Sequence, residues 1–388
     1  MKLFDKQSAQ LLERKVIKHE GPGFRLMARA ALETWKIAKK HSPRKIWAIA
    51  GPGNNGGDAI MTACFALLDS YDVSCSVLEQ PKGDALAALE FSKTIGLEIR
   101  KRLPDIQELK TGCDMVIDGV LGLGASRSPK GRLLSAINFI NEASTKKKVF
   151  VISIDLPSGL DPCSGQVLGQ SAVKADETIM LLSPKQACYT GHSSKHVGTL
   201  VFSDLGITNY YKYGTKTSEL IRPDLFNVGK IPNINHKGSN GSVLILGGWG
   251  NMQGAGFLAG LAAARTGVGK VFICTPNANF RPMELIGIDS KLEDLKSCLK
   301  EVNVVVAGPG LNEEADEHLH LVWKSKLPMV LDAYGLRWLA QNSLPKRTNN
   351  WIGTPHHGET IELLGKYKTE SNRFIQLSLL NKIYGGQW

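Results

Sequence analysis

The segment that most constrains this chain is a glycine-rich run of eight residues, Gly51-Pro52-Gly53-Asn54-Asn55-Gly56-Gly57-Asp58. An apolar run at 46–50 before it predicts a strand, and the pattern at 60–68 after it predicts a helix. Glycines at such a turn let a ligand approach the backbone closely, and the free N–H groups of the next helix can bind an anion. The run fits the G-x-G-x-x-G dinucleotide pattern, but a carboxylate at Asp58 would repel a pyrophosphate. It therefore predicts a site that does more than hold phosphate.

The composition is that of an ordinary globular protein, with 388 residues, 43% of them hydrophobic and 21% charged, enough for two domains. The formal net charge is +11, but the basic residues are dispersed, so we expect attraction for anionic metabolites and no nucleic-acid partner. The seven cysteines form no C-x-x-C pair, which favours reduced thiols in the cytoplasm. We find no signal peptide and no apolar run of membrane-spanning length, so no membrane partner is expected.

Strand and helix patterns alternate along the first half, which predicts an α/β domain with a parallel sheet covered on both faces. Helices are expected at 6–16, 24–40, 60–68 and 84–95, and strands at 46–50, 73–78, 115–117, 149–154, 177–182 and 198–202.

A segment rich in Pro, Asn and Tyr between 204 and 236 marks a connection, after which a second α/β pattern begins. This second pattern has a helix at 254–266 and strands at 242–246, 271–274, 302–306 and 329–331. The sequence therefore predicts two domains, at 1–210 and 222–388.

Three polar clusters follow strands of the first domain, at 54–58, at 118–124 and at 155–161. Because ligands of open α/β sheets bind beyond the carboxyl ends of the strands, we expect these clusters to converge. Their amide, hydroxyl and carboxylate oxygens suit a large monovalent or divalent cation. A carboxylate held near glycine N–H groups can also serve as a general acid or base.

The residues of this first domain, from 1 to about 202, resemble the NAD(P)H-hydrate epimerases, whose fold is a Rossmann-like three-layer α/β/α sandwich. The match lies in the glycine-rich run, in an early helix and in three further motifs, in the family's order. The early helix contains Leu26-Met27-Ala28-Arg29-Ala30. The three further motifs are Val116-Ile117-Asp118-Gly119-Val120-Leu121-Gly122-Leu123-Gly124, Asp155-Leu156-Pro157-Ser158-Gly159 and Lys174-Ala175-Asp176-Glu177-Thr178.

The resemblance implies a reaction: interconversion of the R and S forms of NADH and NADPH hydrated at the nicotinamide C6. It also implies a potassium ion held by Asn55, Asp118 and Ser158, with Asp155 transferring a proton at the C6 hydroxyl. A homodimer is implied as well. The residues expected to contact the hydrate are Asn54, Asn55, Gly56, Gly57, Asp58, Gly122, Leu123, Gly124, Ala125, Ser126, Arg127, Ser128 and Asp155.

The second domain looks like the ADP- or ATP-dependent NAD(P)H-hydrate dehydratases, which have a ribokinase-like fold and use Mg²⁺ with the nucleotide. By this resemblance Ala255, Gly310 and His356 would contact the hydrate. The matching segments are His236-Lys237-Gly238-Ser239-Asn240-Gly241, Gly247-Gly248, Gly254-Ala255, Ala307-Gly308-Pro309-Gly310-Leu311, Leu331-Asp332-Ala333 and Thr354-Pro355-His356-His357-Gly358-Glu359.

Several features of this second domain depart from the family pattern. Tyr334 and Gly335 replace an Asp and an Ala, and His357 replaces a Pro. The family's nucleotide-binding glycines and G-T-G-D motif are absent before Trp388. We therefore expect a truncated ribokinase-like α/β domain that has no dehydratase activity alone, since phosphoryl transfer depends on positioning the nucleotide. The apolar residues at 351–352 and 363–364 then predict an open sheet edge.

Three other functions remain open. The chain could be a non-catalytic nucleotide- or partner-binding protein that keeps the fold, although such a scaffold does not need Asn55, Asp118, Asp155 and Ser158 together. It could be an NAD-dependent dehydrogenase, with Glu79 at the end of the second strand as the ribose-binding acid. The second domain could also be a sugar- or vitamin-kinase-like unit.

Overall fold

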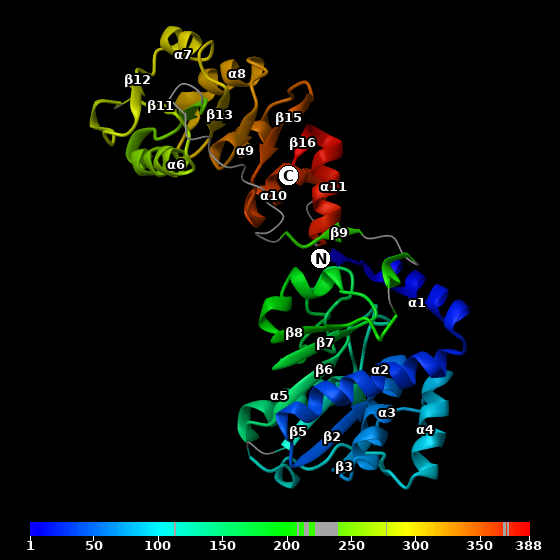
Figure 1. Cartoon of the computed structure of the whole chain (residues 1–388). Helices are drawn as coiled ribbons and strands as arrows, with labels where there is room; N and C mark the ends of the chain where they lie inside the picture. The colour runs from blue at the N-terminus through cyan, green and yellow to red at the C-terminus, as the bar shows by residue number, and fades with distance from the viewer. Residues whose placement is uncertain are drawn as a thin grey trace. The chain divides into compact units, whose positions relative to one another are not determined.

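The computed structural model describes residues 1–388 apart from 112–113, 208, 213–216, 222–239, 277, 368–369 and 371. The chain divides into two compact units, Met1–Phe226 and Asn227–Trp388 (Figure 1). The domain limits expected from the sequence stay predictions, because residues 222–239 lie outside the described part. The His236-Lys237-Gly238-Ser239 portion of the second motif lies outside it as well.

The first unit contains a seven-stranded parallel sheet in the order β4-β3-β2-β5-β6-β7-β8. The order reverses between β2 and β5, which makes this the topological switch point where ligands of open α/β sheets bind. Its strands are β2 (Lys45–Ala50), β3 (Asp72–Val77), β4 (Glu98–Arg100), β5 (Asp114–Gly119), β6 (Phe150–Ile154), β7 (Glu177–Leu181) and β8 (Thr199–Ser203). Apart from β4, each was predicted from the apolar runs.

Helices cover both faces of this sheet. They are α1 (Lys6–Glu20), α2 (Gly23–Ala38), α3 (Asn54–Leu68), α4 (Asp84–Thr94) and α5 (Gly131–Lys147). Side chains of β2 alternate between the two faces, with Ile46 and Ala48 in the core beneath α2 and α3, and Trp47 and Ile49 in the core beneath α5. The predicted three-layer sandwich is therefore confirmed. A short antiparallel pair, β1 (Lys2–Leu3) with β9 (Ser218–Glu219), completes the unit.

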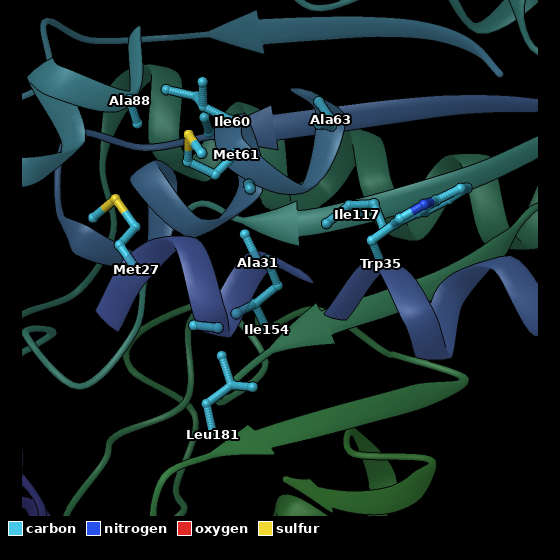
Figure 2. Close-up of a cluster of buried hydrophobic side chains, with 14 of the residues drawn as sticks. Met27, Ala31, Trp35, Ile60, Met61, Ala63, Ala88, Ile117, Ile154 and Leu181 are labelled. Atoms are coloured by element: carbon cyan, nitrogen blue, oxygen red, sulfur yellow. The ribbon is translucent and has the colours of Figure 1, made fainter. Parts of the chain in front are cut away.

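The larger core of the first unit forms where α2 packs against the sheet and α3. Figure 2 shows Ala31 and Trp35 of α2 directed towards Ile117 of β5 and Ile154 of β6. Trp35 is almost fully buried, and its indole N–H donates a hydrogen bond of 2.7 Å to the Asp69 carboxylate.

The second unit has another seven-stranded parallel sheet, in the order β12-β11-β10-β13-β14-β15-β16. Its strands are β10 (Ser242–Leu246), β11 (Lys270–Cys274), β12 (Ile286–Ile288), β13 (Val304–Ala307), β14 (Met329–Leu331), β15 (Arg347–Gly353) and β16 (Gly385–Gln387). Its helices are α6 (Gln253–Arg265), α7 (Leu292–Cys298), α8 (Asp316–Lys324), α9 (Tyr334–Gln341), α10 (His357–Leu364) and α11 (Arg373–Tyr384). The α/β class predicted for this unit is confirmed.

The predicted open edge beside Trp351 is wrong. Strand β16 pairs in parallel with β15, and the Trp388 ring packs edge-on against the Trp351 ring with 4.9 Å between the centroids. Trp351 is 1% exposed as a result. In the described residues, no helix is both long enough and apolar enough to cross a bilayer.

Candidate active site

The glycine-rich run forms a tighter turn than the sequence predicts, because α3 begins at Asn54 and not near residue 60. A Cβ on Gly51 would lie 1.9 Å from the Val120 carbonyl oxygen, and one on Gly56 would lie 1.9 Å from the Gly51 carbonyl oxygen. A Cβ on Gly57 would lie 2.5 Å from Cε of Met27. Three of the four glycines are therefore required by packing within the protein, whereas Gly53 faces open space.

A cavity of about 470 Å³ lies at the carboxyl ends of β2, β5, β6 and β7. Eight of the residues predicted to contact a substrate line it: Asn54, Asn55, Asp58, Gly122, Leu123, Gly124, Ala125 and Asp155. The other five predicted for this unit do not line it, namely Gly56, Gly57, Ser126, Arg127 and Ser128. Gly56 and Gly57 are buried by the close packing just described. Among the described residues, three further charged side chains line the cavity: Glu13, Asp84 and Lys185.

The three residues predicted to hold a cation meet around the Leu121 backbone, at one side of this cavity. Nδ2 of Asn55 donates to the Leu121 carbonyl oxygen at 2.9 Å, and Oγ of Ser158 lies 3.1 Å from the same oxygen. The Ser158 hydroxyl donates to Oδ1 of Asp118 at 2.5 Å. The backbone N–H of Leu121 donates to Oγ of Ser158 at 2.8 Å. The expected convergence of these loops is therefore what the structure has.

Asp118 is fully buried, and every hydrogen bond that it accepts comes from a neutral donor. Besides the Ser158 hydroxyl, the donors are the Ser158 N–H at 2.9 Å, the Ser153 hydroxyl at 2.8 Å and the Val120 N–H at 3.2 Å. Burial raises the pKa of the Asp118 carboxyl, and the bonds from Ser158 and its other donors oppose that rise. A bound cation would favour the ionised form, and the amide, carbonyl, hydroxyl and carboxylate oxygens gathered here suit a hard cation such as K⁺.

Asp155 lies directly after β6, with its backbone held at a φ of 67°, a left-handed conformation that is unusual for a residue with a side chain. Its N–H donates to the Ile179 carbonyl at 2.8 Å, and its Oδ1 accepts from the Leu181 N–H at 3.1 Å. Oδ1 also forms an ion pair with Nζ of Lys185, and that ammonium donates to the Leu181 carbonyl as well. These contacts orient the Asp155 carboxylate at the wall of the cavity.

Lys185 is the main functional residue that sequence reasoning missed. Its side chain is 4% exposed and that of Asp155 is 14% exposed, so the pair is shielded from solvent. The sequence does contain an indication of this role, because Lys185 lies just after β7. That strand was predicted from the sequence and is a direct neighbour of β6. The segment after β7, Leu182-Ser183-Pro184-Lys185, has neither the glycines nor the carboxylate that mark the three predicted clusters.

Two further carboxyl groups of the cavity have raised pKa values. Burial is the largest cause for Asp58, whose pKa lies well above its ordinary value, and repulsion by Asp155 and Glu13 adds to it while Lys185 opposes it. The pKa of Glu13 is raised by burial first and by Asp155 second. A hydrogen bond from the Asn54 side chain to Glu13 acts in the opposite direction. The cavity therefore combines an ion-paired carboxylate with carboxyl groups that favour their neutral form, an arrangement suited to proton transfer.

In the second unit, Ala255 and Gly310 lie together where β10 and β13 end. A Cβ on Gly310 would lie 3.0 Å from Cβ of Ala255, and Gly310 has a φ of +67°. Its carbonyl accepts from the Trp249 N–H at 2.7 Å. His356 begins α10 after β15, and its Nδ1 accepts hydrogen bonds from the N–H groups of Gly358 at 3.0 Å and Glu359 at 3.4 Å. All three predicted residues thus follow carboxyl ends of strands, and His356 has a helix-capping role as well.

Comparisons with known proteins identify both units. Residues 23–187 match the family described as YjeF-related protein N-terminus, and residues 243–384 match the NAD(P)H-hydrate dehydratase family. A bifunctional NAD(P)H-hydrate repair enzyme of Coxiella burnetii is 32% identical, over 99% of this chain and 80% of that protein. One from Escherichia coli is 30% identical, over 94% of this chain and 72% of that protein. The chain belongs to this family of bifunctional NAD(P)H-hydrate repair enzymes.

The family assignment confirms both resemblances found in the sequence. A dehydratase domain is present in the second unit, so its expected truncation and inactivity are not confirmed. A solved structure, an ADP/ATP-dependent NAD(P)H-hydrate dehydratase from Bacillus subtilis co-crystallized with ATP/Mg²⁺, aligns at 28% identity. That alignment covers 39% of this chain and 59% of that chain with a TM-score of 0.30. The predicted homodimer stays a prediction.

Proposed function

We propose that the unit Met1–Phe226 interconverts the R and S forms of hydrated NADH and NADPH. Membership of the repair-enzyme family supports an isomerase of this kind. The observation that carries the proposal is the Asp155–Lys185 pair, which faces a cavity at the sheet's switch point, next to the oxygen cluster of Asn55, Asp118 and Ser158. That combination gives an oriented proton-transfer group and a place for the substrate.

The chemistry requires a group such as Asp155. The hydroxyl on C6 of the hydrate is a poor leaving group until it is protonated, and the neighbouring ring nitrogen then stabilises the cation that remains. Asp155 would exchange a proton with this hydroxyl, while Lys185 and the Leu181 N–H keep the carboxylate in place. Positioned general acids and bases contribute rate factors of about 10²–10⁴.

The proposed substrate contacts are those predicted residues that line the cavity. They are Asn54, Asn55 and Asp58 on α3, Gly122, Leu123, Gly124 and Ala125 after β5, and Asp155 after β6. Asn55, Asp118 and Ser158 would hold the potassium ion, with the Leu121 carbonyl beside them. When bound, K⁺ would supply positive charge next to the buried Asp118 carboxylate.

For the second unit we propose binding of the hydrate by Ala255, Gly310 and His356, with ADP or ATP and Mg²⁺ as the cofactors of its dehydratase family. The positions of these three residues at strand ends of one sheet support the proposal. The dehydrogenase alternative is weaker, because Glu79 is exposed and does not line the cavity of the first unit.

The decisive experiment is incubation of the purified chain with the isolated S hydrate of NADH, with NMR used to follow the appearance of the R form. We expect turnover by the wild-type protein and its loss in Asp155→Asn. Asp72→Asn is the matched control, because Asp72 lies at the amino end of β3, away from the carboxyl ends that form the cavity, and pairs with Lys45 near the surface. Epimerisation no faster than in buffer would contradict the proposal. Addition of ADP and Mg²⁺ to the same mixture measures dehydration by the second unit.

A further inference from the structure

Asp58 is a cavity carboxyl group for which the structure provides no partner. It projects from the first turns of α3 and lines the same cavity as Asp155. In the described part of the chain, no group donates a hydrogen bond to its side chain, and only its backbone carbonyl accepts one, from the Thr62 hydroxyl at 2.7 Å. By contrast, Asp155 is held by Lys185 and the Leu181 N–H, and Glu13 by the Asn54 side chain.

The placement of Asp58 relative to Asp155 follows from the sheet. α3 leaves the end of β2, Asp155 follows β6, and β5 lies between these two strands. Strands two apart are separated by about 10 Å, so Asp58 and Asp155 reach the lining of the cavity from separate elements, α3 and the end of β6. They are still close enough to repel each other, since Asp155 is the largest charge effect on Asp58.

Epimerisation at C6 by loss and re-addition of water needs proton transfer on both faces of the ring. The hydroxyl leaves one face as water, and the water that replaces it must enter from the other. A single carboxyl group on one wall cannot serve both faces of a substrate that stays bound. The alternative is that the ring turns over within the cavity, but the contacts between substrate and protein would then have to break in each cycle.

We propose that Asp58 is a second catalytic residue of the epimerase, acting on the face of the ring opposite to Asp155; this inference rests on the proposed function. In one direction the neutral Asp58 carboxyl gives its proton to the C6 hydroxyl, the C6–O bond breaks and water leaves. The ring nitrogen's electron pair forms a double bond to C6. A water molecule on the other face then bonds to C6 and gives its proton to the Asp155 carboxylate.

The reverse direction uses the same groups with their roles exchanged, so one proton and one water enter and leave in each cycle. Proton exchange with solvent returns both carboxyl groups to their starting forms. The charged groups that face Asp58 are Asp155 after β6, Lys185 after β7 and Glu13 on α1, with Asp84 of α4 also lining the cavity. Burial and the two nearest carboxylates keep Asp58 in the neutral form that the first step requires.

The test is Asp58→Asn, which keeps the shape of the side chain and removes its proton transfer. We expect kcat for epimerisation to fall at least about 100-fold, with KM for the hydrate within about threefold of wild type. One limb of the pH–rate profile should also disappear. The control is Asp72→Asn, at the amino end of β3 and outside the cavity lining. Binding of unhydrated NADH, followed by its fluorescence, reports whether the variant still folds and binds.

A second variant gives an independent measurement. Asp58→Ala leaves space for a small carboxylic acid, and added acetate should restore turnover in proportion to its concentration but have no effect on Asp155→Asn. Turnover by Asp58→Asn within about threefold of wild type would overturn the inference, as would a lack of acetate rescue in a folded Asp58→Ala. Absence of turnover in the wild-type protein would instead refute the proposed function, so the two failures are distinguishable.

Discussion

The Lys185 ammonium forms an ion pair with the Asp155 carboxylate at the ends of two neighbouring strands, β7 and β6. Both side chains are largely shielded from water, and Lys185 has a second partner in the Leu181 carbonyl. A shielded pair of this kind gains little net stability over an apolar pair, but removal of one partner leaves an uncompensated charge. The relationship therefore links the proposed proton-transfer group, Asp155, to the stability of the unit.

Replacement of Lys185 should lower both the stability of the first unit and its epimerase turnover. We expect Lys185→Met to reduce the free energy of unfolding by about 3–5 kcal/mol, because Asp155 loses the one cation that pairs with it among the described residues. Epimerase turnover should fall with it, since the carboxylate is no longer held. Chemical denaturation and the NMR assay measure the two effects. Lys45→Met, which breaks the more exposed Lys45–Asp72 pair, should change stability by no more than about 1 kcal/mol.

The glycine-rich turn allows a matched comparison. Gly51→Ala places a Cβ 1.9 Å from the Val120 carbonyl oxygen, so we expect a loss of about 2–3 kcal/mol and a displaced 120–125 loop. Gly53→Ala meets nothing within 4 Å and has a φ of −97°, so its stability should stay within about 1 kcal/mol of wild type. Equal effects of the two substitutions on the melting temperature would contradict this account of the turn.

The sequence predicted most of the sheet of the first unit because buried parallel strands are continuous apolar runs, as at 46–50 and 149–154. The sequence did not predict β4 (Glu98–Arg100), because it is a charged edge strand of three residues. It did not predict α5 (Gly131–Lys147) either, because Asn, Ser and Thr interrupt the apolar stripe of that helix. The oxygen cluster was predicted because its residues follow strands directly. Glu13 was not, since only the tertiary packing of α1 brings it to the cavity.

Potassium should stabilise the first unit even without substrate. Ligand binding to the folded state adds about 2.7 kcal/mol at 100 times the dissociation constant, so the melting temperature in KCl should exceed that in choline chloride. Ser158→Ala removes one oxygen of the site and should shrink this difference. Ser92 is buried, and its hydroxyl donates to the Leu89 carbonyl within α4 at 2.7 Å, so Ser92→Ala should leave the difference unchanged. Identical melting temperatures of the wild type in the two salts would argue against a K⁺ site.

His356 should contribute to the stability of the second unit through its capping role. Its Nδ1 accepts from the first N–H groups of α10, and the Glu359 side chain accepts from the His356 N–H at 2.9 Å. We expect His356→Ala to cost about 1 kcal/mol, and His356→Asn much less, because an Asn oxygen can accept the same bonds. If His356 also contacts the substrate, both variants should bind the hydrate more weakly than the wild type. Thermal unfolding and binding titrations separate the two roles.

The raised pKa of Asp58 predicts a stability cost that depends on pH. Its carboxyl has an ordinary pKa of 3.8 and a higher one in the folded protein, so the folded state binds its proton more tightly than the unfolded state does. The stabilisation that this proton provides is complete below the ordinary pKa and is lost as the pH rises through the folded one. At neutral pH the site therefore destabilises the fold.

Asp58→Asn has no such proton to lose, so its free energy of unfolding should fall less than that of wild type between pH 4 and pH 8. We expect the variant to be the more stable protein at neutral pH, although it is the less active one, because it no longer places a carboxyl group beside Asp155 and Glu13. Urea denaturation across this pH range measures the difference, with Asp72→Asn expected to parallel the wild type. A variant that loses stability with pH as steeply as the wild type would show that Asp58 titrates normally, and that another carboxyl group supplies the neutral acid of the cavity.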